Sequence, residues 1–98
     1  MQTVELALGN RSGLHARPAA LFVQAAAGFV SKITVENLDR GSEPADAKSI
    51  LMVLTLGVGS GQRVRVTADG PDEAKAIGAL GAAIRAGLGE PVEKATAG

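Results

Sequence analysis

The fold of this 98-residue chain is decided by the stretch GLHARPAA at residues 13–20. It contains the only histidine of the chain, His15, and it joins a strand-like run to a helix-like run. Because proline is tolerated in the first turn of a helix, Pro18 indicates that the helix begins at or next to His15. The backbone amides of Ala16 and Arg17 would then lie at the positive end of the helix dipole, which makes a site suited to an anion.

The side chains of this stretch suit phosphate chemistry. Arg17 carries a planar guanidinium whose forked N–H groups match the oxygens of a phosphate. His15 carries an imidazole, and a neutral imidazole nitrogen with a free lone pair is a nucleophile. Together they indicate a histidine that itself becomes phosphorylated. Simpler interpretations stay open on the residues alone: His15 as an ordinary surface cap of the helix, and Ser12 as a plain loop serine instead of a hydrogen-bond donor to phosphate.

Hydrophobic periodicity predicts the elements along the chain. Alternating apolar residues predict half-buried strands over residues 3–8, 32–36 and 62–68. Helical spacing predicts three helices over residues 16–27, 49–56 and 71–88, with Ser49 as the N-cap of the second and Pro71 as the first residue of the third. Residues 37–46 predict a turn that leads at most into a short strand. One domain is expected over residues 1–88, and the aperiodic residues 89–98 predict a flexible tail that frays from Glu90.

This order of strands and helices predicts an α+β domain with helices on one face of a sheet. Its core has to be aliphatic, since Phe22 and Phe29 are the only aromatic residues of the chain. Gly78 and Gly81 in the last helix would allow that helix to pack closely on the sheet. A ferredoxin-like plait has a similar order of elements, so periodicity alone leaves the topology open.

Composition argues against several classes of function. Ten Lys and Arg residues balance ten Asp and Glu residues, whereas nucleic-acid binders usually carry a basic excess. An RNA-binding plait would also need aromatic residues on its strands, and the predicted strands contain none. With no cysteine and one histidine, we expect no metal site and no cofactor. No apolar run reaches the roughly 18 residues of a membrane span, and no signal peptide is recognisable, so we expect a cytoplasmic protein.

The run GLHARPAA resembles the active-site signature of the histidine-containing phosphocarrier family, HPr, of the bacterial phosphoenolpyruvate:sugar phosphotransferase system. A second match is AKSI at residues 47–50, followed by Leu56-Gly57, and the resemblance covers residues 4–88. It implies an open-faced β-sandwich, a four-stranded antiparallel sheet with three helices on one face in the order βαββαβα. Residues 37–46 depart from the family pattern, because this segment is a few residues longer than usual.

The resemblance implies a phosphoryl carrier and not an enzyme. Nδ1 of His15 would accept a phosphoryl group from enzyme I, which is charged by phosphoenolpyruvate, and would pass it to a sugar-specific enzyme IIA. Arg17, Ala16 and Ser12 would bind the phosphate. A monomer is expected. Carriers that serve nitrogen-linked signalling or dihydroxyacetone phosphorylation share the signature, so the pathway stays open.

Two further features bear on partners. One surface beside His15 has to meet both partners, and its candidate residues are Ala20, Gln24, Ile50, Leu51 and Leu54. For the last three, core packing of a short helix is the alternative. Ser49 matches the serine that a dedicated HPr kinase phosphorylates in many Gram-positive bacteria, and its alternative role is that of a helix cap only. A purely regulatory module acting through phospho-Ser49 is a further alternative, although relatives of that kind lack the active-site histidine.

Overall fold

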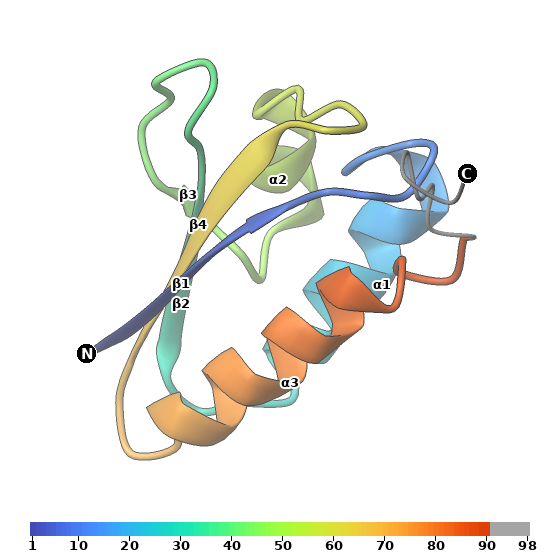
Figure 1. The fold of residues 1–98 in the computed structure, drawn as a ribbon. Helices are drawn as coiled ribbons and strands as arrows, with labels where there is room; N and C mark the ends of the chain where they lie inside the picture. Colours follow the sequence, from blue (N-terminus) through green and yellow to red (C-terminus); the bar gives the residue numbers. More distant parts are fainter. Residues whose placement is uncertain (91–98) are drawn as a thin grey trace.

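The computed structural model describes residues 1–90 of the chain. In chain order, its elements are β1 (Gln2–Ala7), α1 (Ala16–Ala27), β2 (Lys32–Asn37), β3 (Ala45–Asp46), α2 (Ile50–Thr55), β4 (Arg63–Asp69) and α3 (Glu73–Arg85). The strands form one sheet in the order β1-β4-β2-β3, and every neighbouring pair is antiparallel. The helices cover one face of the sheet, and α1 and α3 lie side by side (Figure 1). The predicted open-faced α+β sandwich is confirmed.

The hydrophobic core lies between the sheet and the helices. β4, in the middle of the sheet, buries Val64, Val66 and Ala68, as a period of two predicts. Phe22 of α1 is the largest fully buried side chain and belongs to the same cluster. Because fully burying a side chain of this kind contributes about 1.5–3 kcal/mol, these contacts fix α1 on the sheet. The position of His15 at the start of α1 is fixed with it.

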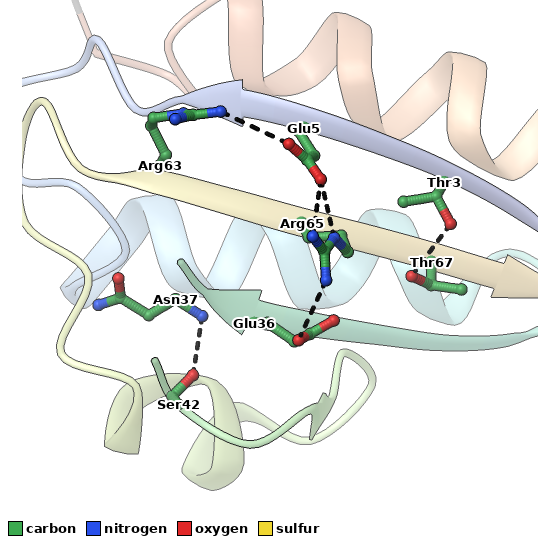
Figure 2. Close-up of polar contacts among 8 residues, drawn as sticks. All are labelled: Thr3, Glu5, Glu36, Asn37, Ser42, Arg63, Arg65 and Thr67. Atoms are coloured by element: carbon green, nitrogen blue, oxygen red, sulfur yellow. Dashed lines mark hydrogen bonds and ion pairs between the residues drawn. The ribbon is translucent and has the colours of Figure 1, made fainter. Parts of the chain in front are cut away.

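The opposite face of the sheet is polar. Figure 2 shows Arg65 of β4 between two carboxylates, with Glu5 of β1 at 2.9 Å and Glu36 of β2 at 3.7 Å. Both carboxylates lie directly opposite Arg65 in the strand register. Thr3 and Thr67 share a hydrogen bond of 3.3 Å further along β1 and β4. Exposed ion pairs contribute only about 0.2–1 kcal/mol each, so this row supports the register more than the overall stability.

The start of α3 differs from its prediction. The helix begins at Glu73, and Pro71 lies outside it, because Asp72 is the N-cap. The Asp72 carboxylate accepts hydrogen bonds from the Ser31 hydroxyl and from the amides of Val30 and Ser31. These bonds, the Ser31 hydroxyl first, lower the pKa of Asp72 from 3.8 to about 2. Asp72 therefore ties the α1–β2 connection to α3, and its own backbone stays outside the helix.

The end of α3 and its glycines also differ from the prediction. The helix ends at Arg85 and does not continue to Leu88. A Cβ atom on Gly81 would lie 3.8 Å from Leu6 of β1, so the predicted close packing on the sheet is confirmed there. Gly78 is exposed with no heavy atom within 4 Å of its ideal Cβ position, so the prediction is wrong for Gly78.

The predicted tail divides into two parts. Gly89 and Glu90 do not fray, because Gly89 lies against Leu21 of α1 and the Glu90 carboxylate accepts hydrogen bonds from Asn10 and Ser12. The remainder of the predicted tail, residues 91–98, lies outside the described residues.

The long segment at residues 37–46 is built around a buried amide. Asn37 is fully buried, and its Nδ2 donates to the Leu56 carbonyl at 3.0 Å. Its Oδ1 accepts from the amides of Asp39 and Arg40, at 3.1 and 3.3 Å. The Ser42 hydroxyl accepts a hydrogen bond from the backbone amide of Asn37 at 2.8 Å (Figure 2). The segment then forms β3, the short strand that the sequence predicts. The Asn37 side chain therefore joins the end of β2 to the end of α2.

Candidate functional site

His15 lies at the N-terminus of α1, where the sequence predicts it. It is the N-cap residue, with an extended backbone at φ −129° and ψ 156°. Its side chain is exposed and makes no capping hydrogen bond. Helix capping therefore does not account for this histidine, and its exposed side chain can be reached by another protein.

The backbone turns sharply directly after His15. Ala16 has a φ of 50°, in the left-handed region. This conformation costs an L-residue roughly 1–2 kcal/mol, and it persists only where the surroundings over-determine it. Contacts on both sides do so here: the Leu14 amide donates to the Val58 carbonyl at 2.9 Å, and Pro18 is buried. Alanine is typical of helix interiors, so the sequence contains no signal of this turn.

Gly13 is required by the close approach of two loops. Its φ is 61°, and a Cβ atom there would lie 2.3 Å from the Val58 carbonyl oxygen and 2.8 Å from Cα of Gly59. Both neighbours belong to the connection between α2 and β4. A larger residue would force one of the loops to move. The glycine that opens the signature therefore holds the loop before His15 against the α2–β4 connection.

Arg17 shares the exposed first turn of α1 with His15 and Ala16. Within residues 1–90 the Arg17 guanidinium forms no ion pair. An uncompensated cation near the positive end of a helix suits a group that carries two negative charges on the neighbouring imidazole. The structure thus brings together three of the four residues predicted to bind phosphate or carry it.

Ser12, the fourth residue, is engaged by a residue that the sequence reasoning missed. The Ser12 amide donates to Oε1 of Glu90 at 2.9 Å, and the Ser12 hydroxyl donates to Oε2 at 2.8 Å. Nδ2 of Asn10 donates to the same carboxylate at 3.1 Å. These bonds, the Ser12 amide first, lower the pKa of Glu90. While Glu90 holds it, the Ser12 hydroxyl is not free to donate to a phosphate.

An exposed apolar surface lies on α2, which packs beside α1. We call it the α2 patch, and its members, with their exposed fractions, are Ile50 (37%), Leu51 (73%), Met52 (46%) and Leu54 (37%). Core packing therefore does not explain Leu51, and Met52 joins the set that the sequence predicts. Of the two candidates on α1, Gln24 is exposed and Ala20 is half-buried. No helix among residues 1–90 has the length and hydrophobicity to cross a membrane.

Ser49 caps α2 as predicted. It is the N-cap residue, and its hydroxyl accepts from the Met52 amide at 3.3 Å. The side chain is half-buried and lies directly before the α2 patch. A charged group attached to this hydroxyl would therefore lie at the border of an exposed apolar surface.

The chain is similar to known proteins. Residues 2–86 match the family model described as the PTS HPr component phosphorylation site. The chain is 47% identical over 88 residues to the multiphosphoryl transfer protein of Salmonella typhimurium. That match covers 90% of this chain and 23% of the relative. The chain therefore spans about a quarter or less of the length of the multiphosphoryl transfer proteins that it matches.

Solved structures show the same architecture. HPr-C-His from Thermoanaerobacter tengcongensis is 44% identical with a TM-score of 0.87, and the match covers 94% of this chain and all of that one. The catabolite repression protein Crh of Bacillus subtilis, described as a domain-swapped dimer, is 39% identical with a TM-score of 0.67. The second match covers 89% of this chain and 94% of Crh.

Proposed function

This chain belongs to the HPr phosphocarrier family of the phosphotransferase system, and we propose that it carries a phosphoryl group on His15. One observation carries the proposal: the imidazole of His15 is exposed at the start of α1, beside Arg17, and takes no part in helix capping. The protein turns over no substrate by itself. It receives a group from one protein and gives the group to another.

The chemistry requires two transfers. In the first, Nδ1 of neutral His15 attacks the phosphorus of phosphorylated enzyme I, a new P–N bond forms, and the bond to the donor breaks. In the second, a nucleophile of enzyme IIA takes the phosphoryl group, and the imidazole leaves. Phosphoryl transfer depends mainly on positioning and charge stabilisation. Arg17 and the amides at the start of α1 supply the charge stabilisation, because they face the developing negative charge.

The α2 patch is the proposed docking surface for both partners. Both proteins have to reach the same imidazole, so both have to cover the surface beside it. Exposed apolar side chains next to α1 suit such contacts, since burying them on docking is favourable. Gln24 and Ala20 extend the same surface along α1.

Sugar uptake is the pathway we propose, with enzyme I as donor and a sugar-specific enzyme IIA as recipient. A nitrogen-linked or dihydroxyacetone-linked route uses the same histidine chemistry and is the alternative. The distinction lies in the donor: the enzyme I that charges this chain fastest identifies the route. We expect the carrier to act in the cytoplasm.

A second candidate function is regulation through Ser49. Its hydroxyl lies at the N-terminus of α2, next to the α2 patch. A phosphate there adds about 1.5–2 negative charges. These charges would repel a donor that arrives with a phosphate of its own, so phosphorylation by an HPr kinase would slow charging of His15.

We propose that the working carrier is a monomer. A monomer leaves both His15 and the α2 patch accessible to partners. Crh is described as a domain-swapped dimer, so the state of this chain has to be measured by light scattering at the concentration used for transfer. A dimer that still transfers phosphate at the full rate would contradict the monomer proposal and leave the carrier proposal intact.

Reconstitution tests the carrier function. The chain is incubated with phosphoenolpyruvate, enzyme I and a sugar-specific enzyme IIA, and the phosphate on enzyme IIA is followed with time. We expect transfer to enzyme IIA only when the chain is present, and none with His15→Ala. Transfer that persists with His15→Ala at the wild-type rate would refute the proposal. A surface variant away from the site, Lys75→Ala on α3, serves as the matched control and should transfer normally.

A further inference from the structure

The chain after α3 turns back toward the loop that leads into α1. Gly87, Leu88 and Gly89 have φ values of 92°, 49° and 84°, so three consecutive residues lie in the left-handed region. Leucine in this region costs roughly 1–2 kcal/mol. The turn is held because Leu88 is only 4% exposed and because Gly89 lies against Leu21 of α1, where a Cβ atom would lie 2.8 Å from Cδ1. A strained turn that is anchored on both sides delivers the next residue, Glu90, to a fixed place.

That place is a set of converging hydrogen-bond donors. The Glu90 carboxylate accepts from the Ser12 amide, the Ser12 hydroxyl and Nδ2 of Asn10, at 2.9, 2.8 and 3.1 Å. Asn10 is completely buried, and its Nδ2 also donates to the Gly13 carbonyl at 2.9 Å. The carboxylate therefore bridges Asn10 and Ser12 in the loop over residues 10–13. These same donors lower the pKa of Glu90, because they favour the ionised carboxylate.

We propose that Glu90 is a positioning residue for phosphoryl transfer: its carboxylate fixes the loop over residues 10–13 and thereby the orientation in which His15 meets its partners. This inference rests on the proposed carrier function. Glu90 acts through the loop, because its carboxylate accepts hydrogen bonds from Asn10 and Ser12.

Gly13 and Leu14 alone separate Ser12, which Glu90 contacts, from His15 in the sequence. Ser12 donates to the Glu90 carboxylate. Gly13 packs closely against the backbone of Val58, and the Leu14 amide donates to the Val58 carbonyl. His15 follows directly, with the strained turn at Ala16 after it. Removing the Glu90 contacts leaves the Val58 contacts as the main anchor, so the loop can rotate about them. Since an error of about 1 Å in the position of a reacting group can cost about 100-fold in rate, a partial loosening should cost about tenfold.

Three variants separate positioning from other effects. Glu90→Gln keeps the size of the side chain but removes its charge, so the bonds from the Ser12 amide and from Asn10 are weakened. The Ser12 hydroxyl has to turn and accept from the new NH₂ group. Glu90→Asp keeps the charge on a shorter side chain and should restore part of the rate. Glu43→Gln is the matched control, because Glu43 is an exposed glutamate in residues 37–46, away from His15, and changes the net charge by the same amount.

Transfer from enzyme I is measured as a function of carrier concentration. For Glu90→Gln we expect kcat to fall about tenfold with KM nearly unchanged, because the α2 patch that docks the donor is intact. Glu90→Asp should give an intermediate kcat, and Glu43→Gln should match wild type. An unchanged kcat for Glu90→Gln, a rise in KM alone, or an equal fall for Glu43→Gln would each overturn the positioning role.

Amide hydrogen exchange supplies a readout that does not depend on activity. The Ser12 amide should be protected in wild type and should exchange at least about tenfold faster in Glu90→Gln. Amides of β4 should keep their wild-type protection, which shows that the variant is folded. Equal exchange of the Ser12 amide in both proteins would refute the proposal that Glu90 fixes the loop over residues 10–13. If wild type accepts no phosphoryl group while the exchange difference is present, the carrier proposal fails, but Glu90 still fixes the loop.

Discussion

Replacing Gly13 with alanine tests how the loop before His15 is held. The new Cβ atom would lie 2.3 Å from the Val58 carbonyl oxygen, where ordinary contact begins at 3.4 Å, so one loop has to move by about 1.1 Å. The left-handed backbone, at φ 61°, costs alanine roughly 1–2 kcal/mol. Forcing extra atoms into a packed site costs about 1–3 kcal/mol more. We expect the free energy of unfolding to fall by about 2–5 kcal/mol, and charging of His15 to slow.

Two other glycines serve as comparisons for Gly13→Ala. Gly41 has the same φ of 61° with nothing within 4 Å, so Gly41→Ala should show the backbone cost alone. Gly78 is open and helical, so Gly78→Ala should raise the free energy of unfolding by up to about 1 kcal/mol. Urea unfolding of the three variants gives the comparison, provided that the slope of free energy against urea is shared. A Gly13→Ala loss no larger than the Gly41→Ala loss would refute the close approach of the two loops.

Four further predictions concern the surface and the pH response. Arg17→Ala should slow transfer at least about tenfold, because a charge-assisted contact to phosphate contributes about 1.5–3 kcal/mol, while Arg17→Lys should restore part of the rate and the unfolding midpoint should not move. Leu51→Ala should raise KM for enzyme I without lowering stability, since this side chain is 73% exposed; a lower midpoint with unchanged KM would place it in the core instead. Ser49→Asp should slow charging of His15 at low salt and recover at high salt, because exposed charges are screened over about 8–10 Å. Asp72→Asn should lower stability at neutral pH. The pKa of Asp72 is lower in the folded protein than in the unfolded chain. Its contribution to the free energy of unfolding is therefore complete above pH 3.8 and disappears as the pH falls through about 2. Urea unfolding at several pH values should therefore show the two proteins converging in acid.

Local patterns were sufficient for much of the fold. The period of two in residues 62–68 correctly places Val64, Val66 and Ala68 in the core, because a strand with one buried face has to alternate. The position of Ser49 before an apolar run predicts a helix cap, and its hydroxyl accepts a hydrogen bond from the Met52 amide. Pro18 likewise predicts His15 at the start of α1, where the structure has it as the N-cap.

The features that the sequence patterns do not predict depend on contacts between residues far apart in the sequence. Glu90 contacts Ser12 across 78 positions of sequence, and its neighbours are small and aperiodic, so the segment resembles a frayed tail. The sequence predicts Asp72 in the first turn of α3, but its carboxylate accepts a hydrogen bond from Ser31, 41 positions away. The left-handed turn at Ala16 follows from anchors on either side and not from any preference of alanine. Helix propensity and periodicity contain none of this information.

The identity of the atom that carries the phosphoryl group is the most direct test of the account. The chain, with imidazole nitrogens labelled with ¹⁵N, is incubated with phosphoenolpyruvate and a cognate enzyme I, and then measured by intact mass spectrometry and by NMR. We expect one phosphoryl group on each chain, phosphorus–nitrogen coupling to Nδ1 of His15, and no added mass in His15→Ala. A phosphoryl group that is retained by His15→Ala, or wild-type chains that stay unmodified while enzyme I is fully charged, would contradict the account.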